Sequence, residues 1–102
     1  MTPIPETLSR EMACTPAEFA RWLPGATCNA GIETSVAADR THYRITLGDG
    51  AIDISTQTCS PRRIAAISLP VLRVTFRFID LDPMQRSAFM ARFDAYTRRG
   101  GG

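Results

Sequence analysis

Apolar and polar residues alternate most regularly in THYRITLGDGAIDIST, residues 41–56. Asp49-Gly50 is a favoured two-residue hairpin loop, and apolar residues occupy every second position on both sides of it. The turn and the alternation agree on one register, with the pairs Leu47–Ile52 and Ile45–Ile54. The pattern therefore predicts an antiparallel hairpin with one buried and one polar face.

A second alternating stretch is RRIAAISLPVLRVTFRFID, residues 62–80. We expect a hairpin about Leu69-Pro70, with QTCSPRR before it as a polar link. Pro70 and Val71 cannot easily supply the positive φ of a tight hairpin turn, so a longer loop is expected. The inner face should carry Ala65, Ile67, Leu69, Leu72, Val74, Phe76 and Phe78, and the outer face Arg73, Thr75 and Arg77.

Two helices carry clear start signals. Thr15 with Glu18 three residues later forms a capping box, and Pro24-Gly25 should end that helix after residues 16–23. Asp82 and Gln85 form a second capping box. The second helix has an apolar stripe of Phe89, Phe93 and Tyr96, and its end carries Arg98, Arg99 and Gly100.

The rest of the chain is less regular. Residues 1–12 show no period and predict a flexible N-terminal arm, with Met12 as an alternative start of translation. A strand is expected near residues 31–37, with a turn at 38–41. The sequence thus predicts one α+β domain over residues 13–99, followed by a flexible glycine tail at 100–102. Its architecture should be a two-layer sandwich, an antiparallel sheet of 4–5 strands covered on one face by an N-terminal and a C-terminal helix.

Composition narrows the class of protein. The 102 residues carry 12 basic and 10 acidic side chains, a net charge of +2, and every basic residue is arginine. So small a charge does not indicate nucleic-acid binding by itself. Apolar runs fall short of a membrane span and the N-terminus lacks signal-peptide features, so we expect a cytoplasmic protein without membrane contact.

Candidate catalytic and metal-binding residues are few. Cys14, Cys28 and Cys59 are odd in number and widely spaced, which argues against a disulfide framework and a zinc site. His42 is the single histidine, and Cys59 with His42 is the one nucleophile–base pair that can be named. Nucleotide-binding and hydrolase motifs are absent from the sequence. We therefore expect a non-catalytic protein without a metal or cofactor.

Two surfaces are candidate binding sites. The outer sheet face should present Arg44, Arg73 and Arg77, with Arg44 near Asp53 on the neighbouring strand. Nucleic acid is a disfavoured partner there, because the aromatics that stack bases fall on the opposite face. The second helix carries a small-residue stripe of Ala88, Ala91 and Ala95 that has no obvious cover. These surfaces favour a binding or assembly (adaptor) domain, either a homodimer or a domain that contacts another protein.

The C-terminal residues RRGGG offer an alternative. They resemble the di-glycine end of ubiquitin-like modifiers and sulfur-carrier proteins, in which the terminal glycine is adenylated and then conjugated or converted to a thiocarboxylate. The resemblance implies a reactive carboxylate at Gly101-Gly102. Those families use a β-grasp fold with a strand before the tail, whereas a helix is expected before the tail here.

Overall fold

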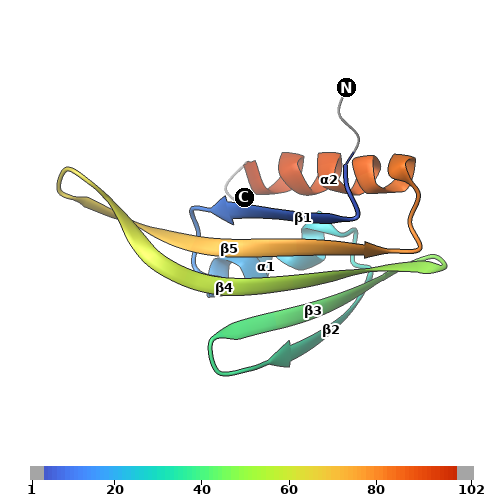
Figure 1. The fold of residues 1–102 in the computed structure, drawn as a ribbon, viewed down its shortest axis with the longest axis horizontal. Helices are drawn as coiled ribbons and strands as arrows, with labels where there is room; N and C mark the ends of the chain where they lie inside the picture. Colours follow the sequence, from blue (N-terminus) through green and yellow to red (C-terminus); the bar gives the residue numbers. More distant parts are fainter. Residues whose placement is uncertain (1–3, 99–102) are drawn as a thin grey trace.

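The computed structural model describes residues 4–98 and has two layers, a five-stranded antiparallel sheet and two helices on one of its faces (Figure 1). The elements follow in the order β1 (Thr7–Met12), α1 (Pro16–Ala26), β2 (Gly31–Val36), β3 (Arg40–Leu47), β4 (Gly50–Ile64), β5 (Ile67–Ile79) and α2 (Pro83–Arg98). The strands lie side by side in the order β1-β5-β4-β3-β2. The predicted α+β sandwich with both helices on one face is confirmed.

The prediction of a loose arm at residues 1–12 is wrong for residues 7–12, which form the edge strand β1. It pairs antiparallel with β5, from Thr7 opposite Arg77 to Met12 opposite Leu72. Its inward-facing side chains are Leu8, Arg10 and Met12. Because the charged Arg10 lies between Leu8 and Met12 on the inward side, the alternation of apolar and polar residues is not apparent in the sequence. Arg10 is accommodated by an ion pair with Asp94 of α2.

Helix α1 begins as predicted but does not end at Pro24-Gly25. The capping box is present, since Thr15 and Glu18 each accept a hydrogen bond from the other's backbone amide. The helix continues through Pro24 to Ala26. Gly25 serves packing rather than termination, because a Cβ there would overlap the Tyr96 ring of α2.

The first predicted hairpin forms with a register shifted by two residues. Its loop is Gly48-Asp49, and Ile45 lies opposite Ile52 rather than Ile54. Gly48 takes a positive φ of 57° at the first loop position, a site that suits glycine. Gly50 instead begins β4, where a Cβ would lie 2.6 Å from Leu81 Cδ2. An even shift preserves the faces, so the predicted buried set is correct although the pairs are wrong.

The second hairpin differs most from the prediction. The expected polar link is part of β4, a strand of 15 residues, and the turn is at Ala65-Ala66 instead of Leu69-Pro70. The register shifts between Cys59 and Arg62, so that two β4 residues, Ser60 and Pro61, lie against Pro70 of β5. The two prolines therefore occupy a bulge, where a missing amide donor is tolerated, and not the ends of strands.

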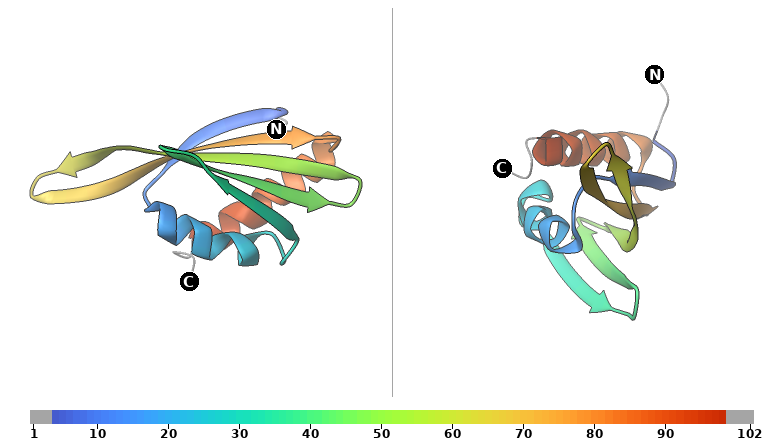
Figure 2. Two further views of the ribbon diagram at one scale, coloured as in Figure 1. Left: turned by 90° about the horizontal axis from the view of Figure 1, so that it is seen from below. Right: turned by 90° about the vertical axis from the view of Figure 1, so that its left-hand side faces the viewer.

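The core lies between the inner sheet face and the helices, as the end-on and side views show (Figure 2). Phe76 of β5 is fully buried at its centre, with the ring of Phe93 5.1 Å away between centroids. The capping box of α2 is confirmed. The side chains of Asp82 and Gln85 each accept a hydrogen bond of 2.8 Å from the backbone amide of the other residue. Of the predicted helix stripe, Phe89 and Phe93 are buried, whereas Tyr96 is 36% exposed and its ring lies beside Gly25 of α1.

Candidate functional site

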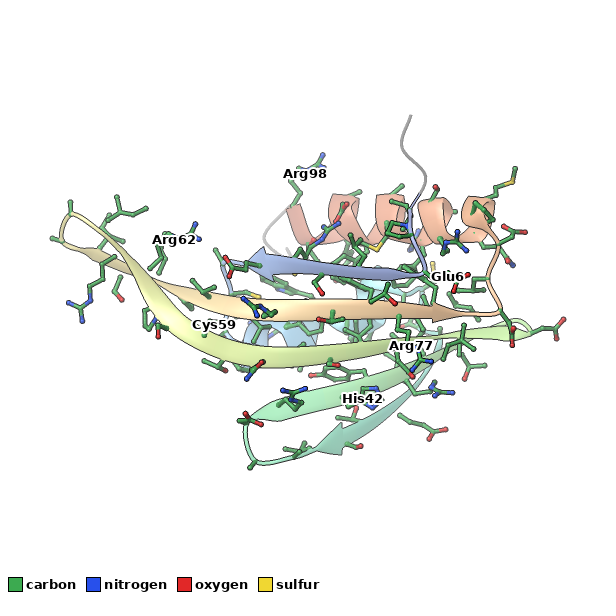
Figure 3. All side chains as sticks on the ribbon, in the orientation of Figure 1. Glu6, His42, Cys59, Arg62, Arg77 and Arg98 are labelled. Carbon is green, nitrogen blue, oxygen red and sulfur yellow. The ribbon has the colours of Figure 1, made fainter. Side chains whose placement is uncertain are left out.

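The three predicted arginines all lie on the outer sheet face. In the pairing register Arg77 is opposite Asp53, Asp53 is opposite Arg44, and Arg44 is opposite Glu33. These residues form one row across four strands in which positive and negative charges alternate. Figure 3 shows Arg77 on this face, with His42 on the neighbouring part of β3.

Two of the three predicted arginines on this face, Arg44 and Arg73, form ion pairs. Arg44 donates to both carboxylate oxygens of Asp53, with the Nη2–Oδ2 distance at 3.1 Å, which confirms the predicted neighbourhood. Arg73 Nη2 lies 3.6 Å from Glu11 Oε2. Paired guanidinium groups of this kind offer little net attraction to phosphates. The arrangement therefore gives no support to nucleic-acid binding on the sheet face.

The alanine stripe of α2 lies on a different part of the surface from the three arginines. Ala88, Ala91 and Ala95 are all exposed. They belong to the helix layer, whereas the arginines belong to the opposite face of the sheet. The two predicted sets therefore do not form one continuous surface, and a role for either set in binding stays a prediction.

The proposed nucleophile–base pair is not assembled. His42 lies opposite Ser55 in the β3–β4 register, and Cys59 is four residues further along β4. Four extended residues span about 13 Å, which is beyond hydrogen-bond reach. The two labelled side chains occupy separate places in Figure 3.

Residues 4–98 contain no cluster of three or more His, Cys, Asp or Glu side chains suited to a metal ion. The two helices within the same range are too short and too polar to cross a membrane. The reactive carboxylate suggested for Gly101-Gly102 lies outside the described residues, and it stays a prediction.

The most distinctive surface feature is a projecting ribbon that the sequence reasoning missed. The distal parts of β4 and β5 extend beyond the rest of the sheet as a two-stranded arm (Figure 1). We use the term arm for residues 60–69, all of which are exposed. Three large apolar side chains on it are exposed to solvent, Ile64 by 55%, Ile67 by 60% and Leu69 by 36%.

The arm has one apolar and one polar face. Past the bulge, Arg62 pairs with Leu69, Arg63 with Ser68 and Ile64 with Ile67. Side chains of successive pairs point to opposite sides. Ile64, Ile67 and Leu69 therefore share one face with Arg62, and Arg63 and Ser68 share the other. We call the first the apolar arm face.

A small hollow lies where the arm leaves the sheet. Its volume is about 150 Å³ and it is lined by Glu11, Met12, Ala13, Arg62, Leu69, Pro70 and Val71. Glu11 is one of the lining residues and contacts two arginines, Arg62 at 3.3 Å and Arg73 at 3.6 Å. We call this feature the root hollow. It adjoins the apolar arm face, because Leu69 belongs to both.

A sequence signal for the arm does exist. Pro61 and Pro70 are placed symmetrically about Ala65-Ala66. A bulge with a proline on each strand and a two-residue turn between them explains this symmetry.

Comparison of the chain with protein-family models, with curated proteins and with solved structures finds no match.

Proposed function

We propose that this protein is a small non-catalytic binding or assembly domain, and that the arm is the element that contacts its partner. The observation that carries the proposal is the apolar arm face, with Ile64 and Ile67 more than half exposed at the tip. A lone two-stranded ribbon is only marginally stable in water. An apolar face on such a ribbon is stabilised when a partner covers it.

The chemistry of the arm favours a protein partner over a nucleic acid. The tip is aliphatic, and Arg62 at its base already contacts Glu11. Pro61 and Pro70 remove amide donors from both strands at the root, which discourages addition of a further strand along the edge. Recognition by side-chain packing on the apolar arm face is therefore favoured over recognition by backbone pairing.

The three cysteines support a reducing compartment. Cys14, Cys28 and Cys59 are all free thiols, and Cys28 is exposed. Exposed free thiols are typical of proteins in reducing environments. We therefore propose that this protein is located in the cytoplasm.

Site-specific photo-crosslinking in the host cell tests the proposal. A photo-reactive phenylalanine analogue replaces Ala66 at the arm tip, and a matched control replaces Asp49 at the tip of the β3–β4 hairpin. Both positions lie in exposed two-residue turns. We expect covalent adducts from position 66 and none from position 49. Equal yields from both positions, or no adduct from position 66, would refute the arm as the contact element.

A further inference from the structure

We infer that the partner of the arm is an acidic protein, which covers the apolar arm face with an aliphatic patch and places carboxylates beside the arginines of the arm. This inference rests on the proposed function, because it names the chemistry of the partner that the arm contacts. Three features carry it: the charge of the arm, the place of Arg62 on the apolar arm face, and the distribution of charge along the molecule.

The arm is positively charged, and carboxylates of the same chain compensate its charge only in part. Residues 60–69 contain Arg62 and Arg63 and no acidic residue. Glu11 of β1 lies 3.3 Å from Arg62 and 3.6 Å from Arg73, so a single carboxylate serves two guanidinium groups. None of the ion pairs among residues 4–98 includes Arg63. The arm and the adjoining end of the sheet therefore have an excess of positive charge, which an acidic surface complements.

Arg62 gives the apolar arm face a charged end. It shares that face with the three exposed aliphatic side chains, whereas Arg63 lies on the polar face. The Arg62 side chain is 62% exposed, and one of its amino groups donates to Glu11. An ion pair this exposed contributes little to stability, so Arg62 is available to bind a carboxylate of a partner. Arginine is also enriched among the residues that dominate the binding energy of protein interfaces.

Charge is distributed unevenly along the longest axis of the molecule, which measures 46 Å. The arm forms one end of this axis, and the β3–β4 loop and the β5–α2 connection lie at the other end (Figure 1). These two connections carry three carboxylates, those of Asp49, Asp80 and Asp82. An acidic partner therefore attracts the arm end and repels the opposite end, which orients the domain with its arm towards the partner.

The two faces of the arm favour a protein over other anionic surfaces. Nucleic acid presents mainly phosphates and sugars to a protein, which leaves the aliphatic side chains of the arm uncovered. A bilayer surrounds an inserted ribbon with lipid on both faces, whereas Arg63 and Ser68 make one face of the arm polar. A second copy of the chain in arm-to-arm contact brings arginines against arginines.

The size of the arm predicts a weak and rapidly exchanging contact. Standard interfaces use about 20–30 residues and remove about 800 Å² from each partner. The arm supplies at most half of those residues, which is typical of transient encounters. Opposite charges on the two partners suit such a contact, because they raise the rate at which the encounter forms.

Photo-crosslinking in a lysate of the host cell tests the inference. Purified full-length chain with the photo-reactive phenylalanine analogue at position 66 is added to lysate that has been cleared of membranes and treated with nuclease. We expect adducts in which the captured peptide carries several Asp or Glu residues. Their yield should be about fivefold lower at about 0.5 M NaCl than at about 0.05 M, because salt screens the attraction between the partners. The same analogue at position 49, at the acidic end of the molecule, should give no adduct at either salt concentration.

Two neighbouring arginines on opposite faces of the arm provide matched variants. Arg62→Gln should lower the yield of adduct about tenfold, because the carboxylate of the partner loses its charged donor. Arg63→Gln removes the same charge from the polar face, where only the long-range attraction is lost, and should lower the yield about two- to threefold. Glu11→Gln should raise the yield about two- to threefold, because Glu11 then no longer competes for Arg62. All three side chains are exposed, so each variant should retain the wild-type circular dichroism spectrum.

The outcomes separate this inference from the proposed function. A yield that does not fall in high salt, or that is the same in Arg62→Gln, Glu11→Gln and the wild-type sequence, overturns the acidic partner and leaves the arm as the contact element. A captured peptide without carboxylates, or one that comes from a second copy of this chain, has the same consequence. Adducts that form only in untreated lysate indicate nucleic acid or lipid and overturn the inference as well. If position 66 gives no adduct in either lysate or in the host cell, both proposals fail.

Discussion

Truncation of Phe76 to alanine should be among the most damaging single changes in this domain. Phe76 is fully buried, and its ring packs on those of Phe78, Phe89 and Phe93 at centroid distances of 6.5, 6.4 and 5.1 Å. Removal of a buried phenylalanine ring costs about 3–5 kcal/mol, because apolar transfer energy is lost and a cavity remains. The upper half of that range is expected here, since three aromatic contacts disappear together.

The matched control is Arg73→Ala on the same strand. Arg73 points to the opposite, solvent face, where its contact is the surface ion pair with Glu11. Its truncation should change the free energy of unfolding by less than about 0.5 kcal/mol. Urea unfolding followed by circular dichroism measures both. A 3–5 kcal/mol loss is a large share of the 5–15 kcal/mol typical of such domains, so Phe76→Ala should lower the unfolding midpoint sharply. Similar losses in the two variants would refute the assignment of the faces of β5.

Three further predictions concern other parts of the fold. Burial, and secondarily the nearby Glu18 carboxylate, raises the pKa of Cys14 from 9.0 to about 11. The folded state thus holds the thiol proton more tightly than the unfolded state, so the free energy of unfolding should fall as the pH rises from 9 to 11. The fall should be less steep in Cys14→Ala, and urea unfolding at each pH measures both proteins. Asp94→Ala should cost about 1–2 kcal/mol in thermal unfolding, because it leaves half-buried Arg10 without its partner. Ala65→Val should speed amide exchange in the arm by about tenfold without lowering the melting temperature, because φ at this position is +53° and a β-branched residue tolerates that conformation poorly.

The sequence alone predicts the faces of the sheet well as far as the bulge, and the registers poorly. Past the bulge the face prediction is wrong, because Ala65, Ile67 and Leu69 were expected on the inner face and are exposed. Period-2 alternation assigns each side chain to a face, and this assignment survives a shift of two residues. The alternation does not distinguish a hairpin loop at residues 48–49 from one at residues 49–50. The close approach of Leu81 to Gly50 favours the first loop, and Leu81 is distant from Gly50 in the sequence. The strand β1 was missed for a related reason. Arg10 sits on its buried side and is satisfied there by Asp94, a partner 84 residues away.

The arm could not be predicted from local rules. Leu69-Pro70 has the composition of a turn, and the seven residues 57–63 have that of a polar link. Both interpretations fail because Pro61 and Pro70 meet in one bulge, a pairing that only the three-dimensional register reveals. The predicted arginine and alanine surfaces exist, but they lie on opposite layers of the molecule. The sequence interpretation assigned Ile67 and Leu69 to the buried inner face of a strand, so their exposure on one face together with Ile64 was not apparent.

Site-specific photo-crosslinking from the arm tip is the most direct measurement of the central claim, that the arm contacts the partner of this domain. A photo-reactive phenylalanine analogue at position 66 is compared in the host cell with the same residue at position 49, in the exposed loop of the β3–β4 hairpin. If the arm is the contact element, position 66 gives covalent adducts and position 49 gives none. Equal yields from the two positions, or no adduct from position 66, would contradict the account.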